Sequence, residues 1–159
     1  MAIDFFQAAC QTKTRKKVFG IYDVPPATLS FENSEEWQVW IDNSSGKEIT
    51  HTAIDDCLGI PDTEGERCES MITYDDVITF IELKDRDGGR WAGKARDQLI
   101  NTIALFKRDA SIAAFTRHYG HISNKQRPNF KSGGKNFSQE FEDKTGGFVL
   151  RVSDVLKIE

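Results

Sequence analysis

Two strand-like segments joined by a pair of aspartates constrain the fold of this chain more than any other feature of its sequence. Residues 67–74 and 77–84 are rich in β-branched and aromatic side chains, and Asp75 and Asp76 lie between them. This pattern predicts a β-hairpin that closes at the two aspartates. Apolar residues occupy both faces of the second segment, and a strand that is buried on both faces belongs inside a layered α/β fold.

The hydrophobic period changes after the predicted hairpin. From residue 91 to about residue 108 apolar side chains recur every three or four positions, which predicts a helix with basic residues at its C-terminal end. Further strands are predicted over 111–122 and 147–152, with a basic, glycine-containing loop over 124–136 between them. We therefore expect one domain over residues 1–159, with an α/β fold in which helices flank a mixed central β-sheet.

The N-terminal third carries weaker patterns. Residues 3–12 predict a short helix, and residues 18–30, with Gly and two Pro, predict an irregular connecting arm. Alternating aromatic and polar residues over 36–43 predict a strand that turns at 43–46. Residues 47–58 are then interpreted as the returning strand of the same pair.

The cysteine content bears on the compartment in which the chain works. There are three cysteines, Cys10, Cys57 and Cys68, and no basic-then-apolar segment opens the sequence. An odd, small number without a secretory signal argues for reduced thiols and against a disulfide framework. No segment approaches the ~20 consecutive apolar residues of a membrane span. The prediction is a protein of the cytoplasm without a membrane segment.

Charge is divided unevenly along the chain. Residues 1–83 contain 6 Lys or Arg and 16 Asp or Glu, a net charge of −10. Residues 84–136 contain 12 Lys or Arg and 4 Asp or Glu, a net charge of +8. One stretch is suited to holding cations and the other to meeting anions, although solvated faces on both stretches would explain the same numbers.

The predicted hairpin brings three charged residues together. If Tyr74 pairs with Val77, Glu69 falls opposite Glu82, and cross-strand partners point to the same face of a sheet. Lys84 lies two residues along from Glu82 and shares that face. Two facing carboxylates repel each other unless a cation lies between them, and Mg²⁺ prefers oxygen ligands of this kind. The alternative is an exposed ladder of charged side chains with no ligand.

These segments resemble the PD-(D/E)XK, or restriction-endonuclease-like, nucleases. Residues 80–84, Phe-Ile-Glu-Leu-Lys, are similar to the E-x-K strand of that superfamily, and residues 68–72 to the strand before it. Residues 95–99 resemble the helix that follows, which in several branches presents a glutamine, here Gln98. Two departures are evident. The first acid is Glu69 where the family normally has aspartate, and no residue is assigned as the upstream acid that many members have, although Glu48, Asp55 and Asp56 are candidates.

The resemblance implies a metal-dependent nuclease, with DNA favoured over RNA as its substrate. Glu69 and Glu82 would bind Mg²⁺ or Mn²⁺, Lys84 would activate water, and Gln98 would lie beside them. The residues expected to contact phosphates are Lys94, Arg96, Lys125 and Arg127. A protein partner such as the ATPase of a bacterial anti-phage defence or repair complex would suit a chain of this size, as would a homodimer. The alternative from a different class is a catalytically silent, nuclease-like binding or scaffold subunit.

A zinc site is a weaker possibility. His118 and His121 are three residues apart, and His51, Cys57 and Cys68 complete the soft ligands available. Their spacing fits no standard zinc pattern. We therefore expect no zinc centre.

Overall fold

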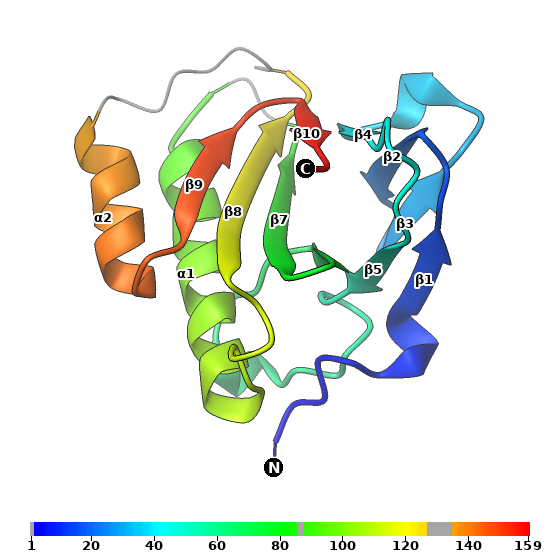
Figure 1. Ribbon diagram of the computed structural model, residues 1–159. Helices are drawn as coiled ribbons and strands as arrows, with labels where there is room; N and C mark the ends of the chain where they lie inside the picture. The colour runs from blue at the N-terminus through cyan, green and yellow to red at the C-terminus, as the bar shows by residue number, and fades with distance from the viewer. Residues whose placement is uncertain (1, 86–87, 127–134) are drawn as a thin grey trace.

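The computed structural model describes residues 2–85, 88–126 and 135–159, and in them the chain is a mixed α/β protein with two β-sheets and two α-helices (Figure 1). A six-stranded sheet has the order β1-β5-β6-β7-β8-β9 and a four-stranded sheet the order β10-β4-β2-β3. The strands are β1 (Gln11–Thr14), β2 (Val18–Asp23), β3 (Ala27–Ser30), β4 (Val39–Asp42), β5 (Ile49–Ala53), β6 (Ser70–Tyr74), β7 (Val77–Lys84), β8 (Arg117–Asn124), β9 (Val149–Val152) and β10 (Val155–Lys157). The helices are α1 (Trp91–Asp109) and α2 (Lys135–Thr145), with 3-10 turns at Ala8–Cys10, Ser34–Glu36 and Asp62–Glu64.

The predicted hairpin and its register are confirmed. Strands β6 and β7 are antiparallel, with Tyr74 opposite Val77 and Ser70 opposite Ile81. Asp75 has a φ of 47°, a left-handed conformation that aspartate tolerates better than most residues. The two-residue connection at the aspartates is therefore the turn that the sequence indicates.

Parallel pairing completes the larger sheet. Strand β7 pairs with β8 in parallel, and β8 with β9 in parallel. Each pair needs a crossover, which α1 provides in the first case and α2 in the second. Because β5 and β6 are antiparallel, as are β6 and β7, strands β5, β7, β8 and β9 all run in one direction and β6 runs against them.

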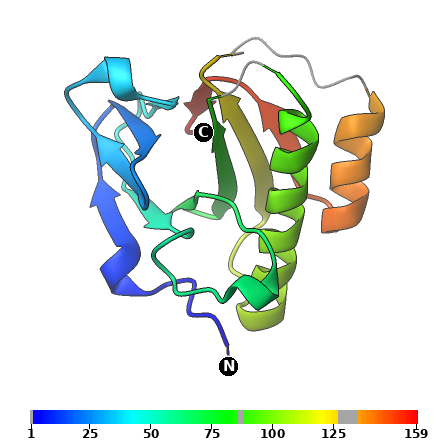
Figure 2. The same cartoon turned by 180° about the vertical axis from the view of Figure 1, so that it is seen from behind.

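Strand β7 is buried on both faces, as predicted, and each face belongs to a different core. On one face Ile78 and Phe80 pack with the helices, in a cluster that includes Leu99 and Phe106 of α1. On the other face Ile81 and its neighbours pack against the four-stranded sheet. Figures 1 and 2 show the helices on one side of the larger sheet and the smaller sheet on the other. Seven of the eight β7 residues are buried, so this strand is the centre of the molecule.

Several predictions for the N-terminal third are wrong. Residues 3–12 form no α-helix: they contain a 3-10 turn and then β1. Residues 18–30 are not an irregular arm but the β2–β3 hairpin, closed by a turn with a cis Pro25–Pro26 bond. Position 20, within β2, is occupied by glycine because the ring of Trp37 packs across it. A Cβ at Gly20 would overlap that ring.

The strand predicted over 36–43 begins later, as β4, and the predicted turn at 43–46 is present. Strand β4 does not pair with β5, the strand that follows it in the chain. Strand β4 pairs with β2 and β10 in the smaller sheet, whereas β5 pairs with β1 and β6 in the larger one. The turn after Asp42 therefore carries the chain between sheets, and a local pattern of residues does not distinguish this from a hairpin.

The C-terminal predictions are partly confirmed. The strand expected over 111–122 begins only at Arg117, and the strand expected over 147–152 is β9. Helix α2 and strand β10 were not predicted. Much of the predicted loop over 124–136 lies outside the described residues. Gly120 of β8 leaves room for Phe141 of α2, because a Cβ at that glycine would overlap the phenylalanine ring.

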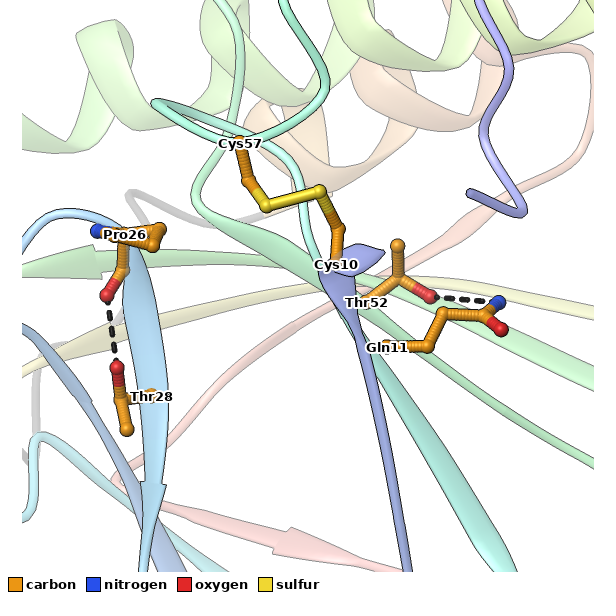
Figure 3. Close-up of a disulfide and its surroundings, with 6 residues drawn as sticks. All are labelled: Cys10, Gln11, Pro26, Thr28, Thr52 and Cys57. Carbon is orange, nitrogen blue, oxygen red and sulfur yellow. Dashed lines mark hydrogen bonds between the residues drawn. A yellow bond between two sulfur atoms is a disulfide. The ribbon is translucent and has the colours of Figure 1, made fainter. Parts of the chain in front are cut away.

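Cys10 and Cys57 form a disulfide, so the prediction of three reduced thiols is wrong (Figure 3). Cys68 is the free cysteine, and it is buried. The disulfide joins the residue before β1 to the loop after β5, two segments that lie together because Gln11 pairs with Thr52. Sequence spacing does not reveal this proximity, because strand pairing between residues about 40 apart creates it. In the described part of the chain, no helix is long and apolar enough to cross a membrane.

Candidate functional site

Glu69 and Glu82 lie together at the end of the β6–β7 hairpin, as the predicted register requires. Glu82 is on β7 and its side chain is only 1% exposed, whereas Glu69 lies just before β6 and is partly buried. The Glu69 amide N–H donates a hydrogen bond of 3.2 Å to Oε1 of Glu82. The Glu69 carbonyl in turn accepts a hydrogen bond of 2.9 Å from the N–H of Ile54, at the end of β5. Backbone pairing therefore holds both glutamates in place.

Lys84 completes the predicted group. Its Nζ lies 3.0 Å from Oε2 of Glu82 and donates a hydrogen bond of 2.7 Å to Oε1 of Gln98 on α1. Nε2 of Gln98 donates to the carbonyl of Arg67 at 3.4 Å, just before Glu69 in the chain. The helix thus orients the lysine through the glutamine. All four residues predicted for the site are brought together by two strands and one helix.

The two carboxyl groups resist ionisation. Burial, together with the charge of Glu82 and then of Asp23, raises the pKa of Glu69 to about 9. Burial raises the pKa of Glu82 to about 7, against the opposing effect of the Lys84 ammonium. Near pH 7 the pair therefore retains protons that an exposed pair would release. A divalent cation would reverse this preference, because it binds the ionised carboxylates.

Asp23 is a member of this group that the sequence did not indicate. It is the last residue of β2 in the smaller sheet, and it lies close enough to Glu69 for each carboxyl group to shift the pKa of the other. Burial raises its pKa, and the charges of Asp55 and Asp56 raise it further. Its Oδ1 is buried and has no hydrogen-bond partner among the described residues. Because residues 18–30 were interpreted as an irregular arm, no sequence signal connected Asp23 with the hairpin.

Among the candidates for an upstream acid, Asp55 lies near Glu69 and Glu82, whereas Glu48 lies away from them. Asp55 follows β5 and is held by Arg67, whose Nε lies 2.8 Å from its Oδ1. Its charge contributes to the raised pKa values of Glu69 and Glu82, so it lies beside them. Glu48 precedes the other end of β5, where Arg15 lies 3.8 Å from it. The structure therefore brings Asp55 to the site and leaves Glu48 away from it.

The predicted phosphate contacts are less well supported. Arg96 lies 3.0 Å from Glu140 and stacks 4.7 Å from the Phe137 ring centroid, so its guanidinium is already engaged. Lys125 donates a hydrogen bond of 2.5 Å to the carbonyl of Glu35. Lys94 is exposed, one helical turn before Gln98, and has no side-chain partner in the part of the chain that the structure describes. Arg127 lies outside the described residues.

A zinc centre is not formed from the histidines and cysteines considered above. His51 and His121 are buried within the larger sheet, and Cys57 is oxidised. Among the described residues, no group of three or more His, Cys, Asp or Glu side chains is arranged to hold a metal ion. A site built on Glu69 and Glu82 would therefore have two protein carboxylates as ligands, with water in the other positions, a pattern that Mg²⁺ accepts.

Comparisons with protein-family models, with curated proteins and with solved structures gave no match.

Proposed function

We propose that this chain is a metal-dependent nuclease of the PD-(D/E)XK kind that hydrolyses phosphodiester bonds, with DNA as its substrate. The observation that carries the proposal is the buried Glu82 carboxylate, which has Lys84 at 3.0 Å on one side and the Glu69 amide at 3.2 Å on the other. A buried acid with a lysine two residues on, opposite a second acid, is the arrangement that the resemblance requires.

The topology supports this proposal. The nuclease superfamily implied by the resemblance has a mixed central sheet flanked by helices. In this chain β5, β6 and β7 form a meander, α1 crosses over to β8, and β8 lies parallel to β7. The acids lie on the meander and the glutamine on the crossover helix. The second sheet is an addition to that plan, and it contributes Asp23.

The residues fit an oxygen-liganded divalent cation. Oδ1 of Asp23 is buried and accepts no hydrogen bond from a described residue, and Oε2 of Glu82 is buried with the Lys84 ammonium 3.0 Å away. Mg²⁺ or Mn²⁺ held by Glu69 and Glu82 would supply Lewis acidity to a phosphate oxygen and a lowered pKa to a bound water. Lys84, aligned by Gln98, would hold that water for attack and stabilise the charge that develops on the phosphate. Asp23 would add a third carboxyl group beside Glu69.

A catalytically silent binding subunit is the second candidate, and one observation favours it. Both oxygens of Glu82 already have a protein group close by, the Lys84 ammonium and the Glu69 amide. In a silent subunit these contacts would only stabilise the fold: Glu82 would neutralise Lys84, and the hydrogen bond from Lys84 to Gln98 would hold β7 against α1. Replacing one partner would then reduce stability but change no reaction.

The Cys10–Cys57 disulfide bears on the predicted location in the cytoplasm. Disulfides persist mainly in oxidising compartments, so a Cys10–Cys57 bond in the working protein would favour a compartment outside the cytoplasm. A nuclease of a defence complex in the cytoplasm would instead carry two thiols at these positions. Mass measurement of the protein purified under alkylating conditions would distinguish the two.

The test is cleavage of single- and double-stranded DNA and RNA in Mg²⁺, in Mn²⁺ and in EDTA. The wild-type protein should cut in either metal and not in EDTA. Lys84→Ala and Glu82→Gln should each reduce the rate by at least 100-fold, because both act on the water and the metal. Lys144→Ala is the matched control, since Lys144 is exposed on α2 without a described side-chain partner.

Calorimetric titration with Mn²⁺ separates the two candidates. A nuclease should bind Mn²⁺, and Glu82→Gln should weaken that binding. A folded wild-type protein that neither cuts nor binds Mn²⁺ would refute the nuclease proposal and leave the silent subunit.

A further inference from the structure

The turn between β1 and β2 is the most basic short segment that the structure describes. Residues 13–17 read Lys-Thr-Arg-Lys-Lys, four basic residues with no acid, in a chain whose net charge is −4. All four basic side chains are exposed. We refer to this segment as the basic turn. It connects the last residues of an edge strand of the larger sheet to the first strand of the smaller one.

A buried asparagine holds the basic turn in one conformation. Asn43 is completely buried, and its amide Nδ2 donates to the carbonyl oxygens of Lys16, at 3.1 Å, and Lys47, at 2.9 Å. Its backbone N–H donates to the carbonyl of Lys17 at 2.8 Å. The Thr14 hydroxyl accepts from the N–H of Lys16 at 3.1 Å. The lysines therefore project from a fixed backbone, which reduces the entropy lost when a ligand binds them.

The charge of the basic turn is scarcely neutralised. Arg15 has one carboxylate nearby, that of Glu48 at 3.8 Å, and both side chains are more than half exposed. Lys13, Lys16 and Lys17 form no ion pair or side-chain hydrogen bond with any residue that the structure describes. Arginines elsewhere are engaged differently: Arg67 and Arg117, for example, each lie 2.8 Å from an aspartate. Uncompensated cations on a rigid turn are suited to a polyanion.

We propose that the basic turn binds the phosphate backbone of a nucleic acid at a distance from the candidate active site. Strand β2 runs from this turn directly to Asp23, so the two lie at opposite ends of one strand. Six residues of extended chain span roughly 20 Å. That distance corresponds to about six nucleotides of one strand of a duplex at ~3.4 Å each. A backbone passing the site would thus reach the basic turn half a helical turn away.

The proposed path of the nucleic acid, from the candidate active site to the basic turn, rests on the proposed function. The proposed binding of phosphates by the basic turn does not. The basic turn is a different surface from the one that the sequence predicted to contact phosphates. Arg96 and Lys125 of the predicted surface already have protein partners, whereas the lysines of the basic turn have none among the described residues. Contact would be with phosphates alone, so it would not depend on base sequence.

The experiment measures binding of a fluorescent 20-base-pair duplex by anisotropy, in Ca²⁺ and separately in EDTA, over a range of salt concentrations. The test protein is the full chain with Lys13→Gln, Lys16→Gln and Lys17→Gln combined. Each lost phosphate contact should reduce the slope of log affinity against log salt by about 0.9, so the triple variant should lose roughly two to three from the slope. Its affinity at low salt should fall at least tenfold.

The matched control is Lys144→Gln, compared with each single variant. Lys144 lies on α2, which Figure 1 shows on the opposite side of the molecule from β1. It should change neither slope nor affinity, whereas Lys17→Gln should reduce the slope by about 0.9. Circular dichroism and the melting temperature verify that the variants remain folded, which is expected because these side chains are exposed and without described partners.

Three outcomes would overturn the proposal, and a fourth would support it alone. A triple variant with wild-type affinity and slope overturns it, and so does a wild-type protein with no measurable affinity for the duplex. The wild-type protein could also bind anionic phospholipid vesicles more tightly than the duplex, with the triple variant losing both kinds of binding equally. That result would assign the basic turn to a membrane surface and would overturn the proposal. Binding that depends on the basic turn in a protein that cuts no substrate would support this inference while refuting the nuclease proposal, so the two failures are distinguishable.

Discussion

The raised pKa of Glu82 makes the stability of this protein depend on pH in a way that one substitution should remove. The unfolded chain releases the Glu82 proton near pH 4.5, whereas the folded protein retains it up to about pH 7. The stabilising contribution of the protonated carboxyl is therefore complete below pH 4.5 and is lost as the pH rises to about 7. One unit of pKa difference corresponds to roughly 1.4 kcal/mol, so the loss between pH 5 and pH 8 should be about 2.5 kcal/mol.

Glu82→Gln removes this titration while preserving the shape of the side chain. We expect the difference in free energy of unfolding between the variant and the wild-type protein to change by ~2.5 kcal/mol between pH 5 and pH 8, in favour of the variant at pH 8. Groups that do not interact with Glu82, including the buried histidines, cancel in this difference. Glu69 does not cancel, because the charge of Glu82 raises its pKa, and its response in the variant adds to the change in the same direction. For a chain of 159 residues the change corresponds to roughly 5–10 °C in melting temperature.

The assay is urea denaturation at pH 5, 6.5 and 8 in EDTA, followed by circular dichroism. Glu142→Gln is the matched control, because it makes the same change of side chain at an exposed position on α2. Adding Mn²⁺ at pH 8 should stabilise the wild-type protein more than Glu82→Gln. A Glu82→Gln difference that is constant across the three pH values would show that the buried carboxyl is not held protonated, and the reasoning would fail.

Three other predictions concern stability. Reduction of the Cys10–Cys57 bond, or Cys57→Ser, should lower the free energy of unfolding by about 4 kcal/mol, because the bond spans 47 residues. An unchanged urea midpoint after reduction would contradict this. His51 and His121 are buried with pKa values lowered to about 4 by desolvation, so each contributes stability that is present above pH 6.5 and lost as the pH falls towards 4. The wild-type advantage over His51→Gln should shrink by roughly 3 kcal/mol between pH 7 and pH 4, measured by urea denaturation, and no shrinkage would mean that the ring is solvated. Gly120→Ala should cost about 1–3 kcal/mol by forcing apart β8 and α2, whereas an undiminished melting temperature would show that the phenylalanine ring can move aside.

Local sequence determined the central part of the fold. The two-residue period of residues 70–74 and 77–84, together with the aspartates between them, sufficed to set the hairpin and its register, and hence to place Glu69 opposite Glu82. A period of three to four was sufficient for the helix that begins at Trp91. Both signals are local, because the residues that repeat are the same residues that meet in space.

Only the tertiary structure decided what surrounds that centre. Asp23 reaches Glu69 because a second sheet packs against β7, and Cys10 reaches Cys57 because β1 pairs with β5. Those contacts join segments about 45 residues apart, and no periodicity encodes which strand will lie beside which. The raised pKa values are of the same origin, since burial and neighbouring charges come from distant parts of the chain. Sequence pattern selects the elements, whereas packing of their apolar faces selects their neighbours, and the chemistry of the site depends on both.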